Sequence, residues 1–201
     1  MDADCEIIQK VKSGDYDAFE LLVEKYQGRI YRHLRKMVND TSHAEDLLQE
    51  TFLNAYRGLR GFEGDSTFST WLFRIATNTA LMFLRKHRPE MVEYDDAIQT
   101  DADNLLSPAA SQFVNTPLEM LLSLEGKREL EKAIDRLPVN YRTVLVLRDV
   151  EGFSLEEVSR IVDSSIAAVK SRLHRARNSV RVALNSYFVE GTASSPGSAS
   201  R

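Results

Sequence analysis

Apolar residues recur at steps of three and four along most of this chain, and this period limits what the chain can fold into. The segment after Asp17 shows it clearly, because apolar side chains follow one another there in one helical stripe as far as about Val38. Its members are Phe19, Leu22, Val23, Tyr26, Ile30 and Leu34. Only nine glycines and five prolines occur in 201 residues, which leaves few of the turns that strands need. The sequence therefore predicts an all-α protein.

Two more helices are predicted in the first 88 residues. Ser42 with Glu45 forms a candidate capping box for a helix that ends near 58–61. A short loop over 61–65 follows, and Ser66 can cap a long helix through about Arg88. Because these helices share one set of apolar residues, we predict that residues 1–88 form the first domain.

An acidic segment separates this domain from the rest of the chain. From Pro89 to Gly126 there are eight Asp or Glu residues and no Lys or Arg. Residues 89–115 also lack an apolar period, so we predict a flexible acidic linker. Thr116-Pro117-Leu118-Glu119 then combines a cap, a proline in the first turn and a glutamate, which predicts a helix start. That helix is expected to stop at Pro138.

Three further helices complete a second domain, predicted over residues 116–190. The first spans about 139–150 and is closed by Gly152, and the second spans 154–162 with a capping box of Ser154 and Glu157. The third runs from Ser165 to about Tyr187. The last two of these helices are joined by a three-residue turn at 163–165, and this arrangement is typical of a helix-turn-helix. Residues 191–201 are rich in Ser, Gly and Ala, and we predict a disordered tail.

The last of these helices is basic although the chain carries a net charge of −4. Residues 164–187 hold five Lys or Arg and no acid. The residues predicted to face the core are Ile166, Val169, Leu173, Ala176 and Val180. The residues predicted on the opposite face are Lys170, Ser171, His174 and Arg175.

This opposite face suits a helix lying in the major groove of DNA. Cations there can contact guanine edges, and Ser or His can pair with a base edge. Arg172 and Arg177 flank the face, and we expect them to contact phosphates. The alternative is a solvated basic surface, which the capped preceding helix, the short turn and the absence of acids disfavour.

A set of short motifs runs through the second domain in a fixed order. They are Leu137-Pro138, Arg142, Val144-Leu145, Gly152-Phe153-Ser154, Glu157-Val158 and Val169-Lys170-Ser171-Arg172-Leu173-His174-Arg175-Ala176-Arg177. This set closely resembles the C-terminal domain of the extracytoplasmic-function (ECF) sigma factors, which belong to the sigma-70 family of RNA polymerase sigma factors.

Two segments of the first domain resemble parts of the same family. Ala44-Glu45-Asp46-Leu47-Leu48-Gln49-Glu50-Thr51-Phe52 is similar to the helix that binds the polymerase clamp. Phe68-Ser69-Thr70-Trp71-Leu72-Phe73-Arg74-Ile75-Ala76-Thr77-Asn78 is similar to the promoter-melting helix. The resemblance covers roughly residues 5–187 without the linker. Asn78-Thr79-Ala80 and the acidic linker resemble most the envelope-stress, sigma-E-like subgroup.

The chain departs from the family pattern at a few positions. Met82 stands where many members have Asp, and Ala167 and Ala168 stand where Gly-Thr is usual. Asp163 replaces a glycine in the turn. Because Asp tolerates a left-handed backbone better than most residues, we expect the turn to survive.

The resemblance assigns a role to an acidic face in the first domain. Asp46, Gln49, Glu50 and Leu53 fall on one face at steps of three, four and seven. By resemblance this face docks on core RNA polymerase, which lacks promoter specificity of its own. The alternative interpretation of this face is a solvated acidic surface with no partner.

The loop and helix after it are implied to open the minus-ten promoter element. The candidate residues are Phe62, Asp65, Phe68, Trp71, Arg74, Asn78 and Arg85. Aromatic side chains beside cations can hold unpaired bases by stacking, and by resemblance the loop captures one flipped base. Aromatic residues at helical spacing are also typical of a core, which is the expected role of Phe73. Asp65 can accept from a base amine, or it can cap the helix that follows.

The remaining expectations concern partners and chemistry. No catalytic motif, cofactor motif or metal-ligand spacing is present, so we expect no enzyme, no cofactor and no small-molecule substrate. The amino terminus resembles no signal peptide and no apolar run would span a membrane, which predicts a cytoplasmic protein. By resemblance the partners are core RNA polymerase, promoter DNA and an anti-sigma factor, in a stress response. The alternative is a stand-alone helix-turn-helix regulator, and a nucleic-acid enzyme is a more distant one.

Overall fold

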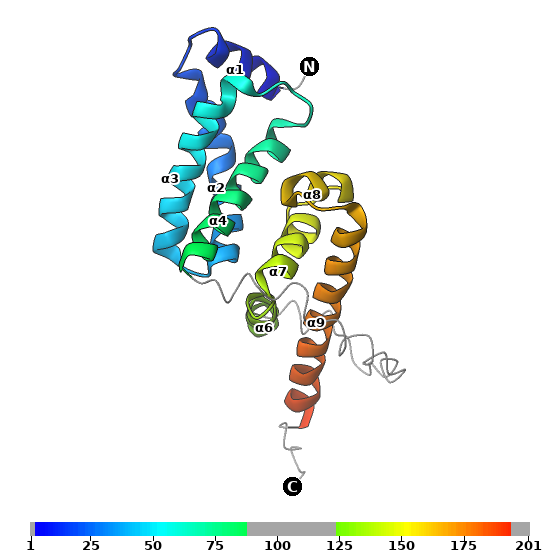
Figure 1. Ribbon diagram of the computed structural model, residues 1–201. Helices are drawn as coiled ribbons and strands as arrows, with labels where there is room; N and C mark the ends of the chain where they lie inside the picture. The colour runs from blue at the N-terminus through cyan, green and yellow to red at the C-terminus, as the bar shows by residue number, and fades with distance from the viewer. Residues whose placement is uncertain (1–2, 88–123, 194–201) are drawn as a thin grey trace.

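A computed structural model describes residues 3–87 and 124–193 of the chain (Figure 1). Every regular element in these two ranges is helical, and they form two helical domains, which confirms the predicted all-α fold. The predicted helix start at Thr116, the acidic linker 89–115 and residues 194–201 lie outside the described residues.

The first domain is a bundle of four helices and one short 3-10 turn. Its elements are α1 (Ala3–Lys12), α2 (Ala18–Val38), α3 (Thr41–Gly58), the turn Leu59–Gly61 and α4 (Phe68–His87). Helices α2, α3 and α4 run side by side, and α1 crosses the end of the bundle (Figure 1). The predicted apolar stripe of α2 faces this core: Leu22, Ile30 and Leu34 are fully buried, as are Leu72 and Phe73 of α4.

Two of the predicted helix caps in this domain are wrong by one or two residues. Helix α3 begins at Thr41, and the carboxylate of Asp40 accepts from the His43 backbone N–H at 3.0 Å, so Ser42 lies inside the helix. For α4 the capping oxygen is that of Thr67, which accepts from Thr70 N–H at 3.2 Å, in place of Ser66. A capping residue must have a non-helical backbone, and its side chain must reach the free N–H of a residue about three positions later. Neighbouring Ser, Thr and Asp residues can all meet these requirements, so the sequence does not show which of them is the cap.

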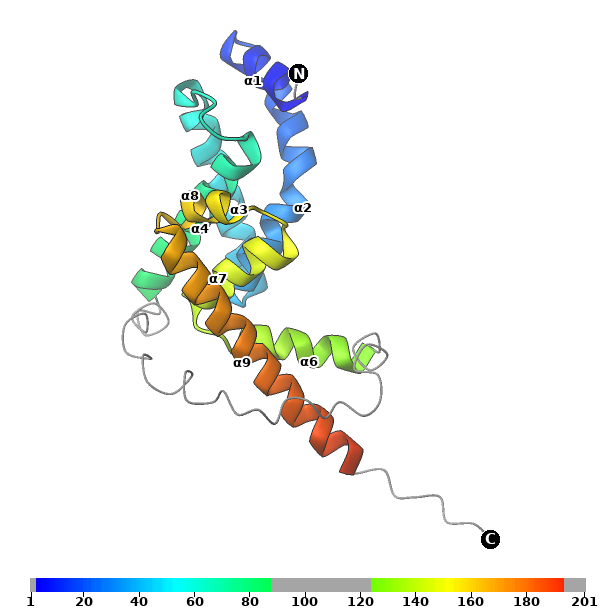
Figure 2. The ribbon, with the colours of Figure 1, turned by 90° about the vertical axis from the view of Figure 1, so that its right-hand side faces the viewer.

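The second domain contains α6 (Leu124–Asp135), α7 (Val139–Leu145), a π-helical continuation at Val146–Val150, α8 (Leu155–Val162) and α9 (Ile166–Ala193). In Figure 2, α9 runs from α8 past α6, and its C-terminal turns project beyond the other helices. The predicted capping box is present, because Ser154 and Glu157 each bond the other's backbone N–H. Helix α9 is described as far as Ala193, and the rest of the predicted tail, residues 194–201, lies outside the described residues.

The turn between α8 and α9 has the expected geometry. Asp163 closes α8 in the left-handed region, at φ 50° and ψ 53°, so the turn does survive the exchange of Gly for Asp. Val169, Leu173 and Ala176 face the core as predicted. Ile166, also predicted there, is 38% exposed. It is the first residue of α9, and the polar turn before it provides no apolar surface to cover it.

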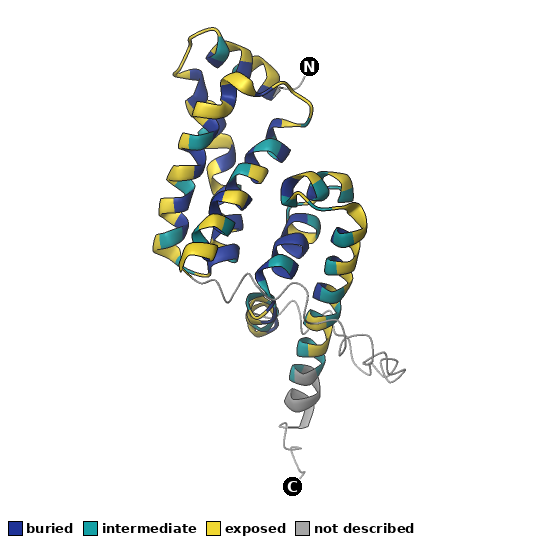
Figure 3. Ribbon diagram, in the orientation of Figure 1, coloured by how far each residue is buried: buried dark blue, intermediate teal, exposed yellow. Residues whose placement is uncertain are grey.

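The two domains are in contact. Helix α8 packs along α4, and α7 packs against α2. Figure 3 shows α7 buried along nearly its whole length, and all of its residues except Asn140 belong to the interior. A short helix that is apolar on most faces needs cover on more than one side, and here α9 and α2 both contact it.

His33 lies at the centre of the first domain. Its side chain is fully buried, its Nε2 lies 2.9 Å from the Thr77 hydroxyl, and its ring lies 5.3 Å from that of Phe73. Burial lowers the pKa of His33 to about 4. The folded protein therefore holds this imidazole neutral at pH values where an unfolded chain protonates it.

We predict that His33 makes the fold sensitive to acid. The pKa of His33 in the folded protein lies below the unfolded value of 6.5, so protonation of this side chain favours the unfolded chain. The contribution of neutral His33 to the free energy of unfolding is therefore fully present above pH 6.5 and is lost as the pH falls toward 4. The loss should amount to at most about 3 kcal/mol. Thermal unfolding of wild type and of His33→Gln between pH 7 and pH 4 measures it, and His33→Gln should flatten the dependence. The exposed His87→Gln is the control, and an equal pH slope in wild type and His33→Gln would contradict the assignment.

Candidate nucleic-acid and polymerase interfaces

The solvent face of α9 presents three polar side chains together. Lys170, Ser171 and His174 are all exposed, while the apolar stripe of the same helix packs against the core. The capping box fixes where α8 begins, and the left-handed Asp163 fixes how α9 leaves it. This geometry leaves one helical face free of acids and pointing away from the domain.

The arginines of α9 are more constrained than the sequence suggests. The Arg172 guanidinium donates to the Ser164 hydroxyl at 3.1 Å, and the half-buried Arg175 donates to the Tyr141 hydroxyl at 3.3 Å. Both bonds tie the arginine to its own domain. Of the six predicted residues, Lys170, Ser171 and His174 therefore form the accessible centre of the face.

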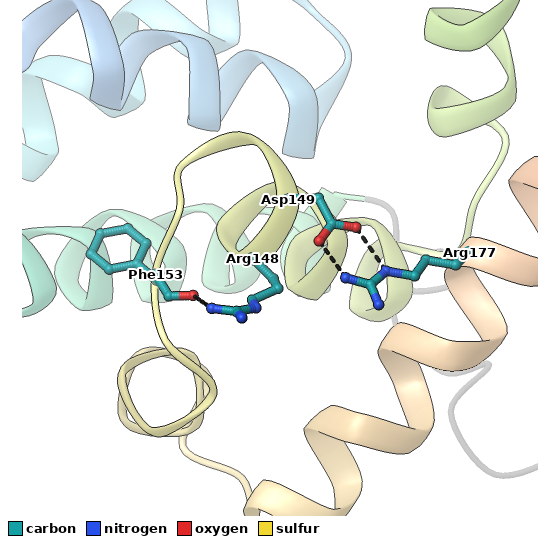
Figure 4. Close-up of polar contacts among 4 residues, drawn as sticks. All are labelled: Arg148, Asp149, Phe153 and Arg177. Carbon is teal, nitrogen blue, oxygen red and sulfur yellow. Dashed lines mark hydrogen bonds and ion pairs between the residues drawn. The ribbon is translucent and has the colours of Figure 1, made fainter. Parts of the chain in front are cut away.

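Arg177 is engaged most strongly, in a two-bond ion pair with Asp149 (Figure 4). Its Nε and Nη2 donate to the two carboxylate oxygens at 2.9 and 2.6 Å, and these bonds raise the pKa of Arg177. Next to it, Arg148 donates to the Phe153 carbonyl at 2.7 Å and holds the loop that leads into α8. Arg177 thus links α9 to the end of the π-helical segment, a partner that the sequence did not reveal.

In the first domain, the loop after the 3-10 turn carries an aromatic cluster. The Trp71 ring lies 5.1 Å from Phe62 and 5.7 Å from Phe68. Phe62 and Phe68 are buried, and Lys12 holds the loop by donating to the Phe62 carbonyl. Trp71 is half-buried and lies over Gly58, where an added Cβ would come within 3.2 Å of the ring. Among these three aromatics, Trp71 is the least buried.

The polar candidates on this side lie along α4. Arg74, Asn78 and Arg85 are exposed and share one face, because they follow one another at steps of four and seven. Asp65 is exposed as well, and the cap it was considered for is made by Thr67.

The four residues predicted to contact polymerase all lie exposed on α3. Asp46, Gln49 and Glu50 are exposed, and the Leu53 residue is 54% exposed although it is apolar. Gln49 and Leu53 line a shallow groove together with Phe19, Phe52 and Tyr56. Sequence reasoning missed Tyr56, which continues the same helical step three residues after Leu53. An acidic rim beside an exposed apolar groove is typical of a protein interface.

A second hollow, also missed, lies between α1 and the end of α3. It is lined by Tyr16 and Tyr56, whose rings lie 6.2 Å apart, and by Lys12, Arg57 and Arg60. The Arg60 guanidinium donates to the Tyr16 hydroxyl at 3.4 Å. Aromatic rings and cations within one hollow suit a nucleotide. The sequence signal was weak, because these residues come from two distant segments.

Two family matches cover both domains. Residues 22–90 match sigma-70 region 2, and residues 127–180 match sigma-70 region 4. The chain belongs to the sigma-70 family and to its ECF group. It is 38% identical to the RNA polymerase sigma-H factor of Pseudomonas aeruginosa, over 90% of this chain and 93% of that one. It is 36% identical to the ECF sigma factor SigW of Bacillus subtilis and to the ECF sigma-E factor of Escherichia coli. These two alignments each cover 87% of this chain, and they cover 92% and 90% of the respective relatives.

Solved structures agree with this sigma factor fold. CnrH, in complex with the cytosolic domain of CnrY, has a TM-score of 0.65 at 25% identity and covers 92% of this chain and 99% of its own. The sigma factor RpoE of Bartonella quintana, in complex with the anti-sigma factor NepR, has a TM-score of 0.60 at 24% identity. It covers 83% of this chain and 96% of its own, and at this identity it supports the fold alone.

Membership of the family defines the function. The protein is a sigma factor, a transcription initiation factor that directs RNA polymerase to promoters. A stand-alone helix-turn-helix regulator would not account for the region 2 match. Within residues 3–87 and 124–193 no helix is long and apolar enough to cross a membrane. In the same two ranges no cluster of His, Cys, Asp and Glu could hold a metal ion.

We predict that Asp149 restrains Arg177 from contacting DNA phosphate. Asp149→Asn should strengthen binding to non-specific duplex and steepen the plot of log Kobs against log salt concentration by up to about one unit. Fluorescence anisotropy across a salt series measures both. Glu156→Gln removes the same charge from an exposed position of the same domain and is the matched control. Equal salt slopes for the two variants would show that Arg177 gains no phosphate contact.

Proposed function

We propose that the Lys170, Ser171 and His174 face of α9 reads the minus-thirty-five promoter element from the major groove. The observation that carries this proposal is the acid-free face that the capped α8 and the left-handed Asp163 present to solvent. An α-helix fits the major groove, where each base pair shows a distinct pattern of donors and acceptors. In this proposal residues 116–190 form the minus-thirty-five domain, and Arg172 and Arg175 contact phosphates near the groove edge.

Lys170→Ala and His174→Ala should each relax promoter preference at one or two positions of the minus-thirty-five element. A lost base contact costs about 1–3 kcal/mol at the position it reads. Transcription by reconstituted holoenzyme from a panel of single-base promoter variants measures this. Arg181→Ala, an exposed cation on the same helix, should instead weaken all promoters equally. Unchanged preference in both test variants would remove this face as the reader.

We propose that the first domain, residues 1–88, opens the minus-ten element. Trp71 supplies the stacking ring, and Arg74, Asn78 and Arg85 follow the separated strand along α4. The buried Phe62 and Phe68 shape the loop from beneath, and the exposed Asp65 faces the base that is flipped out. The hollow between Tyr16 and Tyr56 lies beside the same loop and extends this track for an unpaired nucleotide.

We propose that the α3 face formed by Asp46, Gln49, Glu50 and Leu53 docks on the clamp of core RNA polymerase. Its acidic rim and apolar groove lie next to each other, as a specific protein contact needs. Charges that are buried on docking contribute strongly, because reversal places like charges against each other.

Reversing both acids, Asp46→Lys with Glu50→Lys, should abolish co-purification with core polymerase and transcription. The fold should survive, since exposed substitutions usually change stability by no more than about 0.5 kcal/mol. Glu20→Lys with Glu24→Lys makes the same charge change at exposed positions four residues apart on α2, and this pair should keep both activities. If the α3 variant still bound core and initiated normally, the assignment of the face would be wrong.

We also propose that the protein acts in the cytoplasm with polymerase, carries out no catalysis of its own, and is held inactive by an anti-sigma factor in a stress response. The support for a regulatory protein partner is the solved structure of CnrH, at 25% identity, which is in complex with the cytosolic domain of CnrY. Transcription from a cognate promoter with core polymerase, with and without this protein, tests the function as a whole.

A further inference from the structure

Helix α1 reaches the loop that carries the aromatic cluster of the first domain. Lys12, the last residue of α1, donates from its Nζ to the carbonyl of Phe62, which lies 50 residues further along the chain. The Phe62 backbone N–H donates to the Leu59 carbonyl at 3.1 Å, so both backbone polar groups of Phe62 are bonded. The point where the loop leaves the 3-10 turn is therefore fixed from two sides.

The loop between the 3-10 turn and α4 lies on the surface. Residues 63–65 are exposed, and Gly64 turns the chain with a φ of 87°, in the left-handed region that favours glycine. At the far end of the loop the Thr67 hydroxyl accepts from the Thr70 N–H at 3.2 Å, which joins the loop to the first turn of α4. Within residues 3–87 the loop is therefore held at Phe62 and at Thr67, and the bond from α1 secures the first of these points.

The position of Phe62 helps to decide the position of Trp71. The Phe62 ring is buried and lies 6.1 Å from the Phe68 ring and 5.1 Å from the Trp71 ring. Phe68 belongs to α4 and is only 2% exposed, so it is fixed by the core, whereas the Phe62 ring follows the backbone of the loop. Trp71 therefore lies against one ring that α4 fixes and one ring that depends on Lys12.

Helix α1 is a firm anchor for this bond, because a buried carboxylate ties the helix to α2. Asp4 is 4% exposed, and its two carboxylate oxygens accept from the Lys25 ammonium and from the Tyr26 hydroxyl, both on α2. A desolvated carboxylate is costly to leave without its partners, so α1 does not separate easily from α2. Ile8 and Val11 of α1 are also buried in the core. Lys12 therefore extends from a helix whose position is fixed.

We infer that Lys12 is a positioning residue of the minus-ten reader. Through the Phe62 carbonyl it holds the loop over residues 62–67 and the Trp71 ring in the geometry that receives an unpaired base. The inference rests on the proposed function for the role of this loop and of Trp71. It adds a role for α1, which sets the geometry of the loop without itself contacting the base.

A lysine suits this task because it joins a charged donor to a long apolar stem. Hydrogen bonds from a charged donor are shorter and stronger than bonds between neutral groups. The loss of one such bond should lower the population of the bonded arrangement roughly tenfold. The apparent affinity of a protein falls by the same factor as the population of its binding-competent state. The Lys12 bond should therefore raise the affinity of the loop for a base by up to about tenfold.

The fluorescence of Trp71 reports the position of the loop, because Trp71 is the single tryptophan of the chain and its ring lies against Phe62. Lys12→Met keeps the apolar stem and removes the donor. In the full chain this change should expose Trp71, which raises the Stern–Volmer constant for quenching by acrylamide and shifts the emission to longer wavelength. Lys12→Arg keeps a charged donor and should stay close to wild type. Lys10→Met removes the same charge from an exposed position of the same helix and should leave the emission unchanged.

The effect on base recognition is measured with holoenzyme and a promoter fragment whose non-template minus-ten strand is left single-stranded. Lys12→Met should lower the affinity for this fragment roughly tenfold, and Lys12→Arg should restore most of it. A set of matched fragments carries an abasic site at each minus-ten position in turn. At the position of the flipped base, the difference between Lys12→Met and wild type should disappear. A lysine that only contacted phosphate would instead support binding to intact and abasic fragments alike.

The two measurements together distinguish this inference from the proposed function. Helicity by circular dichroism should stay constant across the variants, since Lys12 lies at the end of α1 and its stem is kept. Unchanged quenching of Trp71 in Lys12→Met, or a loss of affinity that no abasic site removes, would overturn the inference. If Trp71 becomes exposed while the affinity for the intact fragment stays at the wild-type level, Lys12 does position the loop, and the assignment of the loop as the minus-ten reader fails.

Discussion

The Glu157 carboxylate fixes the position of α8 in two directions at once. One oxygen accepts from the Ser154 backbone N–H and closes the capping box, while the other accepts from the Thr70 hydroxyl of α4. Burial raises the pKa of this carboxyl, but the bonds from Ser154 and Thr70, with the nearby charge of Arg160, hold the pKa below its ordinary value. A single ionised group therefore sets where the helix-turn-helix starts and where it rests on the first domain.

Charge is distributed so that the same chain can be acidic overall and still bind DNA. The α3 face is acidic beside an apolar groove, and residues 166–187 of α9 carry cations and no acid. Acids that do lie near α9 are used locally, as Asp149 is by Arg177. At the domain interface α2 supplies the cations, and the second domain supplies the acids Glu131, Asp135 and Glu151. Different partners thus meet surfaces of different sign.

Much of the fold and of the candidate surfaces could be predicted because they depend on short-range rules. Only residues a few positions apart decide three of these features: the apolar stripe of α2, the capping box of Ser154 and Glu157, and the turn at Asp163. The caps of α3 and α4 were misplaced because several adjacent residues satisfy the same rule. The roles of Arg177, Tyr16 and Tyr56 could not be found, since their partners come from segments far away in the chain.

The sequence by itself determined the helices, the helix-turn-helix and the family, because periodicity, caps and motif order are all written along the chain. Only the tertiary structure decided which of the aromatic and charged side chains are accessible to a partner. Phe62 and Phe68 are buried beneath Trp71, and Arg142 is almost fully buried in α7, where burial lowers its pKa despite the opposing charge of Asp135. Arg29 reads in sequence as one more cation on α2, yet it contacts Glu151, which is 122 residues away. The physical reason is that desolvation and long-range pairing depend on which surfaces meet, and a helical period fixes only which residues share a face.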